Sequence, residues 1–181
     1  KNIRISNSLA KIRGIEGAVA SVYYRTWHGI PLKWFRVKSR PIPDNWREIG
    51  PRNMTWRKGA DRARHPVNAM LNYGYAMAIS QLRAEVIAHG LDPLIGVAHS
   101  ELDKNPIPLV YDLIEPLRPL VDRKILEFAL THTFEPQDFI INRFGACRIN
   151  PQMAKRLVEG IAFEENQVRS LVKGFLSKLT Y

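Results

Sequence analysis

The chain contains 181 residues, 45% of them hydrophobic, which is enough to bury the core of a single domain. Lysine and arginine outnumber aspartate and glutamate by 27 to 17, and the resulting net charge of +10 favours polyanions such as nucleic acid as partners. A single cysteine excludes an internal disulfide and a cysteine-cluster zinc site, and Cys147 is more typical of a small buried apolar residue than of a nucleophile. No apolar run is long enough for a membrane span or a signal peptide, which predicts a cytoplasmic protein with no membrane partner.

Residues 8–27 are predicted to form an amphipathic helix, because their apolar residues recur at steps of three and four. These residues are Leu9, Ile12, Ile15, Val19, Val22 and Tyr23. Glu16 lies against this apolar stripe, between Gly14 and Gly17. Each glycine inside a helix costs about 1 kcal/mol relative to alanine, so the pair predicts a place where another group approaches the backbone closely.

Residues 31–65 read as a loop with short helical pieces at most, because prolines interrupt any long helix. This basic segment carries ten basic side chains against three acidic ones, an excess of seven. Such a run is usually a solvated face. Here, however, Trp34, Phe35, Trp46 and Trp56 alternate with the arginines, a pattern suited to backbone phosphates and to stacking on unpaired bases.

The rest of the chain predicts helices. Pro66 opens a helix that ends at Gly90, where a left-handed cap belongs. A second helix covers roughly residues 107–131, with a kink or break at Pro116 and Pro119. Asn150 and Pro151 form an N-cap and first-turn pair for a third, and a further helical stretch runs toward Leu179. Strand signals are poor, so we predict an all-α, multi-helix domain over residues 1–181.

Asp112, Glu115 and Arg118 follow one another at steps of three, on one face of an otherwise apolar helix. Buried carboxylates need partners, so one interpretation is an internal salt bridge from Arg118 to one of the acids. The other is a divalent-metal site that combines Asp112 and Glu115 with the imidazole of His99. A lone histidine in an apolar run is more often structural than a ligand. The motifs of metalloproteases, P-loop NTPases, Rossmann enzymes and serine hydrolases are absent from the sequence.

Four stretches together resemble one family: "IRGIEGAVASVYY", "RARHPVNAMLNYGYAM", "GLDPLIGVAHS" and "YDLIEPLRP". They are similar to the C-terminal helical domain of the metal-dependent endonuclease that acts as integrase in CRISPR spacer acquisition. The order and spacing of the stretches agree with that family from about residue 9 to residue 160. One departure is His65, because the family commonly has aspartate before this proline.

The resemblance implies a catalytic site made of Glu16, His99, Asp112 and Glu115, in which Glu16, His99 and Glu115 bind Mg²⁺ or Mn²⁺. Asp112 would assist the metal or orient DNA. Phosphodiester cleavage and strand transfer of spacer DNA into a CRISPR array are the implied reactions, with prespacer and repeat-array DNA as substrates. We expect the DNA contacts to come from Arg57, Lys58, Arg62, Arg64 and Arg118.

The family also has an N-terminal β-rich domain that builds much of its dimer, and no counterpart of that domain is expected in this chain. Homodimerisation is therefore expected only with that domain, and a small ferredoxin-like adaptation subunit is the implied protein partner. Two alternatives stay open. One is a non-catalytic, all-α nucleic-acid-binding module in which the ionisable side chains only hold helices together. The other is a transposon-encoded integrase relative that uses the same site.

Overall fold

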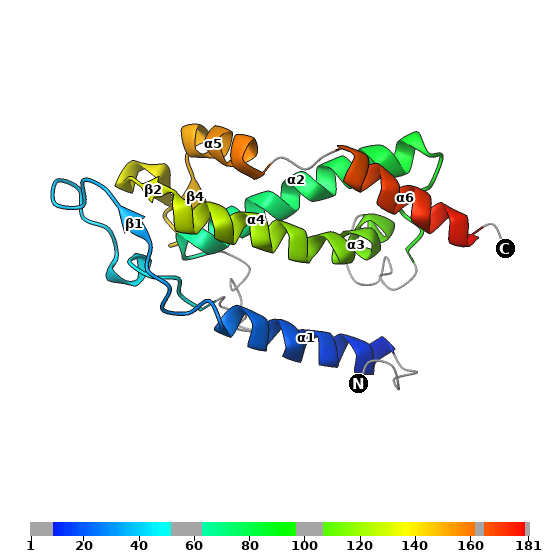
Figure 1. Ribbon diagram of the computed structural model, residues 1–181, viewed down its shortest axis with the longest axis horizontal. Helices are drawn as coiled ribbons and strands as arrows, with labels where there is room; N and C mark the ends of the chain where they lie inside the picture. The colour runs from blue at the N-terminus through cyan, green and yellow to red at the C-terminus, as the bar shows by residue number, and fades with distance from the viewer. Residues whose placement is uncertain (1–8, 52–62, 97–106, 162–164, 180–181) are drawn as a thin grey trace.

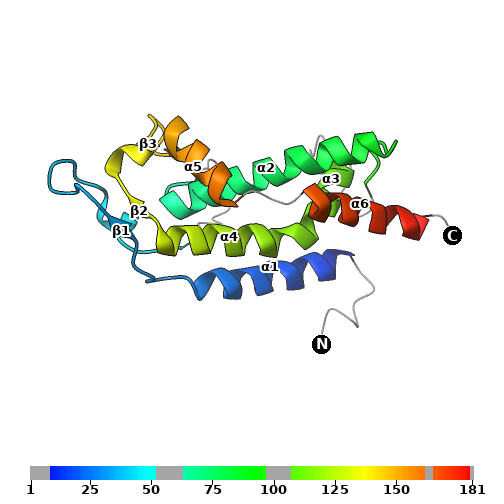
Figure 2. The same ribbon diagram turned by 45° about the horizontal axis from the view of Figure 1, so that its top comes forward.

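The computed structural model describes residues 9–51, 63–96, 107–161 and 165–179, and these ranges are mainly helical (Figure 1). Its longest helix, α2 (Pro66–Ala88), packs against α3 (Pro108–Ile114), α4 (Arg118–Thr131) and α6 (Glu165–Leu179). The helix α5 (Pro151–Ile161) packs on α4. In two views α1 (Leu9–Arg25) runs alongside α4 at the edge of the bundle (Figures 1 and 2). The all-α prediction is confirmed.

The helix α2 is the centre of the core, and its boundaries follow the sequence signals. One face of α2 is apolar and buried, and it consists of Val67, Met70, Leu71, Ala78, Leu82 and Val86. Pro66 is its first residue, and Gly90 has a φ of +73°, as the left-handed cap requires. His65 is the N-cap, and its Nδ1 accepts the backbone N–H of Val67 at 3.2 Å. A histidine thus does here the capping that aspartate would do.

The helix expected over residues 107–131 is broken where the prolines predict. A short 3₁₀ turn, η4 (Glu115–Leu117), separates α3 from α4. Proline has no N–H to donate to the preceding turn, so Pro116 and Pro119 favour this interruption. The break places Glu115 at the first position of the turn and Arg118 at the first position of α4.

Two short strand pairs were not predicted. β1 (Lys33–Trp34) pairs in parallel with β2 (Thr133–Phe134), and β3 (Phe139–Ile141) pairs antiparallel with β4 (Cys147–Ile149). Strands of two or three residues are too short for an alternating pattern to be recognised.

The stacking role expected for Trp34 and Trp46 is wrong. Trp46 is only 3% exposed, inside the short turn η2 (Asp44–Trp46), and Trp34 stacks on it with ring centroids 6.0 Å apart. The indole N–H of Trp34 donates to the carbonyl of Trp46, and both rings contact Phe139. Trp46 belongs to the core and half-buried Trp34 packs against it, so both rings are used inside the fold. Phe35 is 53% exposed, and Trp56 lies outside the described residues.

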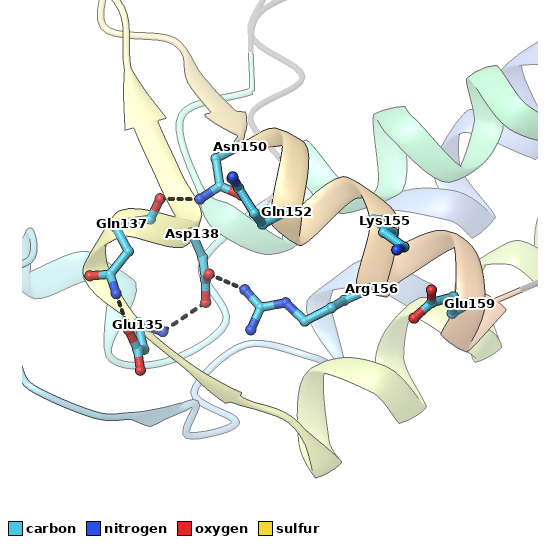
Figure 3. Close-up of a pocket in the computed structure, with 8 residues that line it drawn as sticks. All are labelled: Glu135, Gln137, Asp138, Asn150, Gln152, Lys155, Arg156 and Glu159. Atoms are coloured by element: carbon cyan, nitrogen blue, oxygen red, sulfur yellow. Dashed lines mark hydrogen bonds and ion pairs between the residues drawn. The ribbon is translucent and has the colours of Figure 1, made fainter.

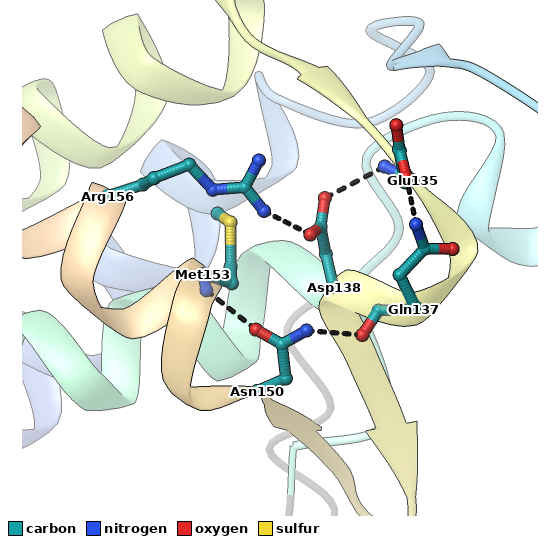
Figure 4. A network of polar contacts seen from close by, with 6 residues as sticks. All are labelled: Glu135, Gln137, Asp138, Asn150, Met153 and Arg156. Carbon is teal, nitrogen blue, oxygen red and sulfur yellow. Dashed lines mark hydrogen bonds and ion pairs between the residues drawn. The ribbon is translucent and has the colours of Figure 1, made fainter.

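The start of α5 is fixed by the expected cap (Figure 4). Asn150 accepts the backbone N–H of Met153 at 2.6 Å, and its amide donates to the carbonyl of Gln137 at 2.6 Å. Nearby, the buried carboxylate of Asp138 pairs with Arg156. In the preceding turn, η5 (Pro136–Asp138), Asp138 also belongs to a capping box. The network ties the start of α5 to the chain before β3.

Cys147 is buried, as expected, and burial raises the pKa of its thiol to about 12. Its thiolate is therefore scarce at neutral pH, which fits a structural role. Among the described helices, none is both long enough and apolar enough to cross a membrane.

We predict that His65 makes stability depend on pH. Burial lowers the pKa of His65, so the unfolded chain takes up a proton at higher pH than the folded chain. The stability that neutral His65 provides is therefore present above the ordinary histidine pKa of 6.5 and is lost as pH falls below it. Urea unfolding at pH values on either side of that pKa measures the effect. His65→Asn keeps a capping acceptor and should remove this dependence, and His65→Ala should cost about 1–2 kcal/mol at neutral pH. The exposed His28→Asn is the control, and an equal change there would contradict the prediction.

We also predict that Gly74→Ala destabilises the bundle where α2 meets α4. A Cβ at Gly74 would lie 2.9 Å from Cγ1 of Val121, inside a filled core. Overpacking of this kind costs about 1–3 kcal/mol. Gly174→Ala in α6, where no described atom lies within 4 Å, should instead be neutral or stabilise by about 0.5–1 kcal/mol. Chemical denaturation of both variants checks the contrast, and equal effects would refute it.

The close approach expected at Gly14 and Gly17 is not found among the described residues.

Candidate functional site

Two acids that are far apart in the sequence meet beside α4. Glu16 lies on the exposed surface of α1, and half-buried Glu115 opens the turn η4. The carboxyl group of Glu16 is close enough to act on the ionisation of Glu115. Burial raises the pKa of Glu115, Arg118 lowers it, and the charge and hydrogen bond of Glu16 raise it further. The net pKa is above the ordinary value. Like charges held this close favour a cation between them.

Arg118 supplies one positive charge to this pair of acids. Its Nε donates to Oε1 of Glu115 at 2.9 Å, across one turn at the junction of η4 and α4. The internal salt bridge expected from the sequence spacing is therefore present. Both side chains remain about one third exposed, at 36% and 34%, so the pair faces a surface that solvent and ligands can reach.

The structure places the other expected residues unevenly. Asp112 is half-buried on α3, one turn before Glu115. Arg64 is exposed, and its carbonyl accepts the indole N–H of Trp46 at 3.1 Å. His99, Arg57, Lys58 and Arg62 lie outside the described residues. The convergence thus concerns Glu16, Glu115 and Arg118, with Asp112 on the neighbouring turn.

Three residues that the sequence analysis did not single out adjoin this convergence. Asp122 of α4 is 4% exposed and accepts hydrogen bonds from two tyrosine hydroxyls. Tyr24 of α1 donates to its Oδ2 at 2.9 Å, and Tyr75 of α2 donates to its Oδ1. The guanidinium of Arg118 lies over the ring of Tyr75, 5.1 Å from its centroid. An acid four residues after Arg118 in an apolar helix was the available signal.

The donor set fits a divalent cation. Glu16 and Glu115 bring two carboxylates close together. Arg118 balances one of them, so one negative charge remains for a cation to neutralise. Carboxylate oxygens are the ligands that Mg²⁺ and Mn²⁺ prefer. Within the described ranges no group of three histidine, cysteine, aspartate or glutamate side chains is placed to hold a metal ion. Glu16 and Glu115 thus account for two ligands of such a site.

A cavity of about 750 Å³ lies elsewhere, between the turn η5 and α5 (Figure 3). Its lining includes Glu135, Asp138 and Glu159 together with Lys155 and Arg156. The charge of Asp138 is already matched by Arg156, and its second oxygen accepts the backbone N–H of Glu135 at 2.8 Å. Since its buried acid is already satisfied, this cavity offers less to a cation than the exposed pair at α1.

Comparison with known proteins places the chain in one family. The sequence profile of the CRISPR associated protein Cas1 matches residues 1–162. The CRISPR-associated endonuclease Cas1 1 of Methanospirillum hungatei is 31% identical over 155 residues, which are 85% of this chain and 41% of the relative. The corresponding endonuclease of Leptospira interrogans is 27% identical over 98% of this chain and 64% of its own length. The chain thus spans less than two thirds of these relatives.

Solved structures share the fold. A CAS1 protein from Thermotoga maritima, 22% identical, superposes with a TM-score of 0.74 over 98% of this chain and 52% of its own. A casposase bound to its integration product, 23% identical, gives the same TM-score over 98% of this chain and 53% of its own. The profile match covers nearly the whole chain, and on that basis the chain belongs to the Cas1 family of CRISPR-associated proteins.

Proposed function

We propose that this chain is the catalytic part of a divalent-metal-dependent DNA endonuclease and integrase that transfers spacer DNA into a CRISPR array. The observation that carries the proposal is the meeting of Glu16 and Glu115, from helices distant in sequence, beside the cation of Arg118. Two adjacent acids on an accessible surface destabilise the folded state because their negative charges repel each other. A bound cation relieves this repulsion, and such pairs are therefore common at functional sites. Because the relatives are named endonucleases, we take DNA phosphodiesters as the proposed substrate of this chain.

The residues take distinct parts in this proposal. Glu16, Glu115 and His99 hold Mg²⁺ or Mn²⁺, which when bound offsets the negative charge that develops on the phosphate oxygens. Arg118 keeps Glu115 ionised through its salt bridge. The exposed part of its guanidinium can also contact a DNA phosphate. Asp112, one turn before Glu115, orients the attacking hydroxyl or the DNA end.

DNA binding rests on charge. The basic segment, residues 31–65, holds an excess of seven positive charges, among them the proposed DNA contacts Arg57, Lys58, Arg62 and Arg64. Exposed Phe35 carries Arg36 over its ring at 5.2 Å, so this part of the segment presents an aromatic side chain with a cation. Phosphates should provide most of the affinity, because such contacts release counterions.

The proposed protein partners follow from relatives. One solved relative is the Cas6-RT-Cas1–Cas2 complex, whose fold matches 95% of this chain with a TM-score of 0.70. A small ferredoxin-like adaptation subunit is therefore the proposed partner. We further propose that homodimers form through the N-terminal β-rich domain of the family. The casposase likeness supports the transposon-encoded integrase as the second candidate, with transposon ends as the DNA.

We predict that Glu16→Gln and Glu115→Gln each reduce metal-dependent cleavage of a labelled branched DNA by about 100-fold or more, the scale of removing one group that stabilises developing charge. Each change preserves shape and removes a charge. Reactions with Mn²⁺, with Mg²⁺ and with EDTA measure the metal dependence, and His99→Ala extends the test to the third proposed ligand.

Glu127→Gln is the matched control, because Glu127 lies on α4 but is 67% exposed in a loose pair with Arg123. Its activity should equal that of the unmodified chain. Tight DNA binding without metal-dependent cleavage, unaffected by Glu16→Gln, would instead favour the binding module. In that case Glu16→Ala should alter stability alone.

We predict that Arg64→Ala weakens binding similarly for all DNA sequences and lowers the salt dependence of binding by about one counterion. Arg64 is exposed at the end of the basic segment, so the fold should not change. Fluorescence anisotropy over a series of salt concentrations measures the slope. Arg123→Ala, a 68% exposed arginine on α4, should leave the slope unchanged, and equal slopes for all three proteins would contradict the assignment of Arg64.

A further inference from the structure

The described side chains of α1, the helix that carries Glu16, make few apolar contacts with the rest of the molecule. Among the described side chains of α1 none is buried, and Val19 and Val22 are 57% and 60% exposed. Of these side chains, only that of Tyr24 packs against the core. Apolar burial normally fixes the position of a surface helix. Trp27, two residues after α1, is 4% exposed in the core and contacts the rings of Tyr23 and Tyr24. Both views show α1 at the edge of the bundle (Figures 1 and 2).

A polar, partly buried contact also attaches α1 to the bundle. The hydroxyl of Tyr24 donates to Oδ2 of Asp122 at 2.9 Å and lies 2.7 Å from the hydroxyl of Tyr75. Tyr75 donates to the other oxygen of the same carboxylate. Hydrogen bonds to a carboxylate are stronger than neutral ones, and the 4% exposure of Asp122 protects them from water. One acid of α4 thus joins α1 to α2.

The same network reaches the acidic pair from the other side. Arg118, one turn before Asp122 on α4, lies over the ring of Tyr75 and donates to Glu115. Glu115 in turn meets Glu16 on α1. The helix α1 is therefore linked to the bundle at two places by one connected series of contacts, at Tyr24 and at Glu16.

Geometry makes the position of Glu16 sensitive to Tyr24. The two residues are eight positions apart, which is about 12 Å along a helix axis. A tilt of α1 by roughly 10° about Tyr24 would move Glu16 by about 2 Å. Misplacing a catalytic group by about 1 Å can cost about 100-fold in rate. Loss of the Tyr24 hydroxyl can therefore change the position of Glu16 relative to Glu115.

We propose that Tyr24, Tyr75 and Asp122 are positioning residues that hold α1 so that Glu16 and Glu115 meet at the reactive site. This inference rests on the proposed function for its consequence, which is metal binding by the two acids. The anchoring itself is a statement about geometry and is tested separately.

The first experiment measures the binding of Mn²⁺ alone by electron paramagnetic resonance, well below the unfolding temperature of each variant. Tyr24→Phe and Tyr75→Phe remove one hydroxyl each, and we expect Mn²⁺ affinity to fall by about 10- to 100-fold, as for residues that orient metal ligands. Asp122→Asn keeps an acceptor for one hydroxyl and should lose less affinity than Asp122→Leu. The control is Tyr73→Phe, two positions from Tyr75. Tyr73 lines a different cavity, beside β4, so this variant should bind Mn²⁺ normally.

The second experiment measures proximity without metal or DNA. Glu16→Cys and Glu115→Cys, combined in one chain, should be joined rapidly by a short bifunctional thiol reagent, while buried Cys147 stays unreactive. Adding Tyr24→Phe should slow this cross-linking several-fold, and adding Tyr73→Phe should not.

The two experiments separate the proposals. Cross-linking that is as fast in the Tyr24→Phe background as without it would overturn the positioning role, even if that variant melts at a lower temperature. Unchanged Mn²⁺ affinity in Tyr24→Phe, with tight binding by the unmodified chain, would overturn it as well and leave the proposed function standing. Slowed cross-linking in a chain that binds no Mn²⁺ would support the positioning role and count against the proposed function.

Discussion

The approach of two like-charged side chains is the constraint around which the rest of this structure is arranged. Glu16 and Glu115 come together although burial, and then the nearby carboxyl group of Glu16, disfavour the ionised form of Glu115. Arg118 offsets part of this effect from 2.9 Å away. Three elements must be fixed for this to happen: α1 with Glu16, the turn η4 with Glu115, and the start of α4 with Arg118. A break in the helix at two prolines provides the last two at once.

The bundle behind this pair supplies rigidity. The helix α2 is buried along one face, and at Gly74 a side-chain methyl of α4 lies only 2.9 Å from where a Cβ would stand. Such close packing fixes α4 relative to α2, and hence Arg118 and Asp122 relative to Tyr75. The edge helix α1 is attached to this frame by the hydroxyl of Tyr24 on the carboxylate of Asp122, and the buried ring of Trp27 follows its last turn. The rigid core fixes Glu115, and the attachment of α1 to that core places Glu16 beside it.

Aromatic residues show where sequence patterns mislead. Trp34 and Trp46 stand among arginines, which predicts contact with nucleic acid, yet their rings pack together with Phe139. A pattern of charge and aromatics does not tell which way a side chain faces in an irregular loop, because no helix or strand period constrains it. Where local geometry is constrained, the same kind of analysis succeeds. Pro66 and Pro151 begin the helices that they were expected to start, and Asn150 is the expected cap of the second.

The sequence by itself determined the helical class, the starts of α2 and α5, the break at Pro116 and the one-turn spacing of Asp112, Glu115 and Arg118. These features depend on neighbours within about four residues, where backbone chemistry and helix period suffice. Only the tertiary structure decided that Glu16 meets Glu115 and that Tyr24 and Tyr75 share Asp122. Those contacts join residues from different helices, and their partners follow from how the helices pack, which no local pattern encodes.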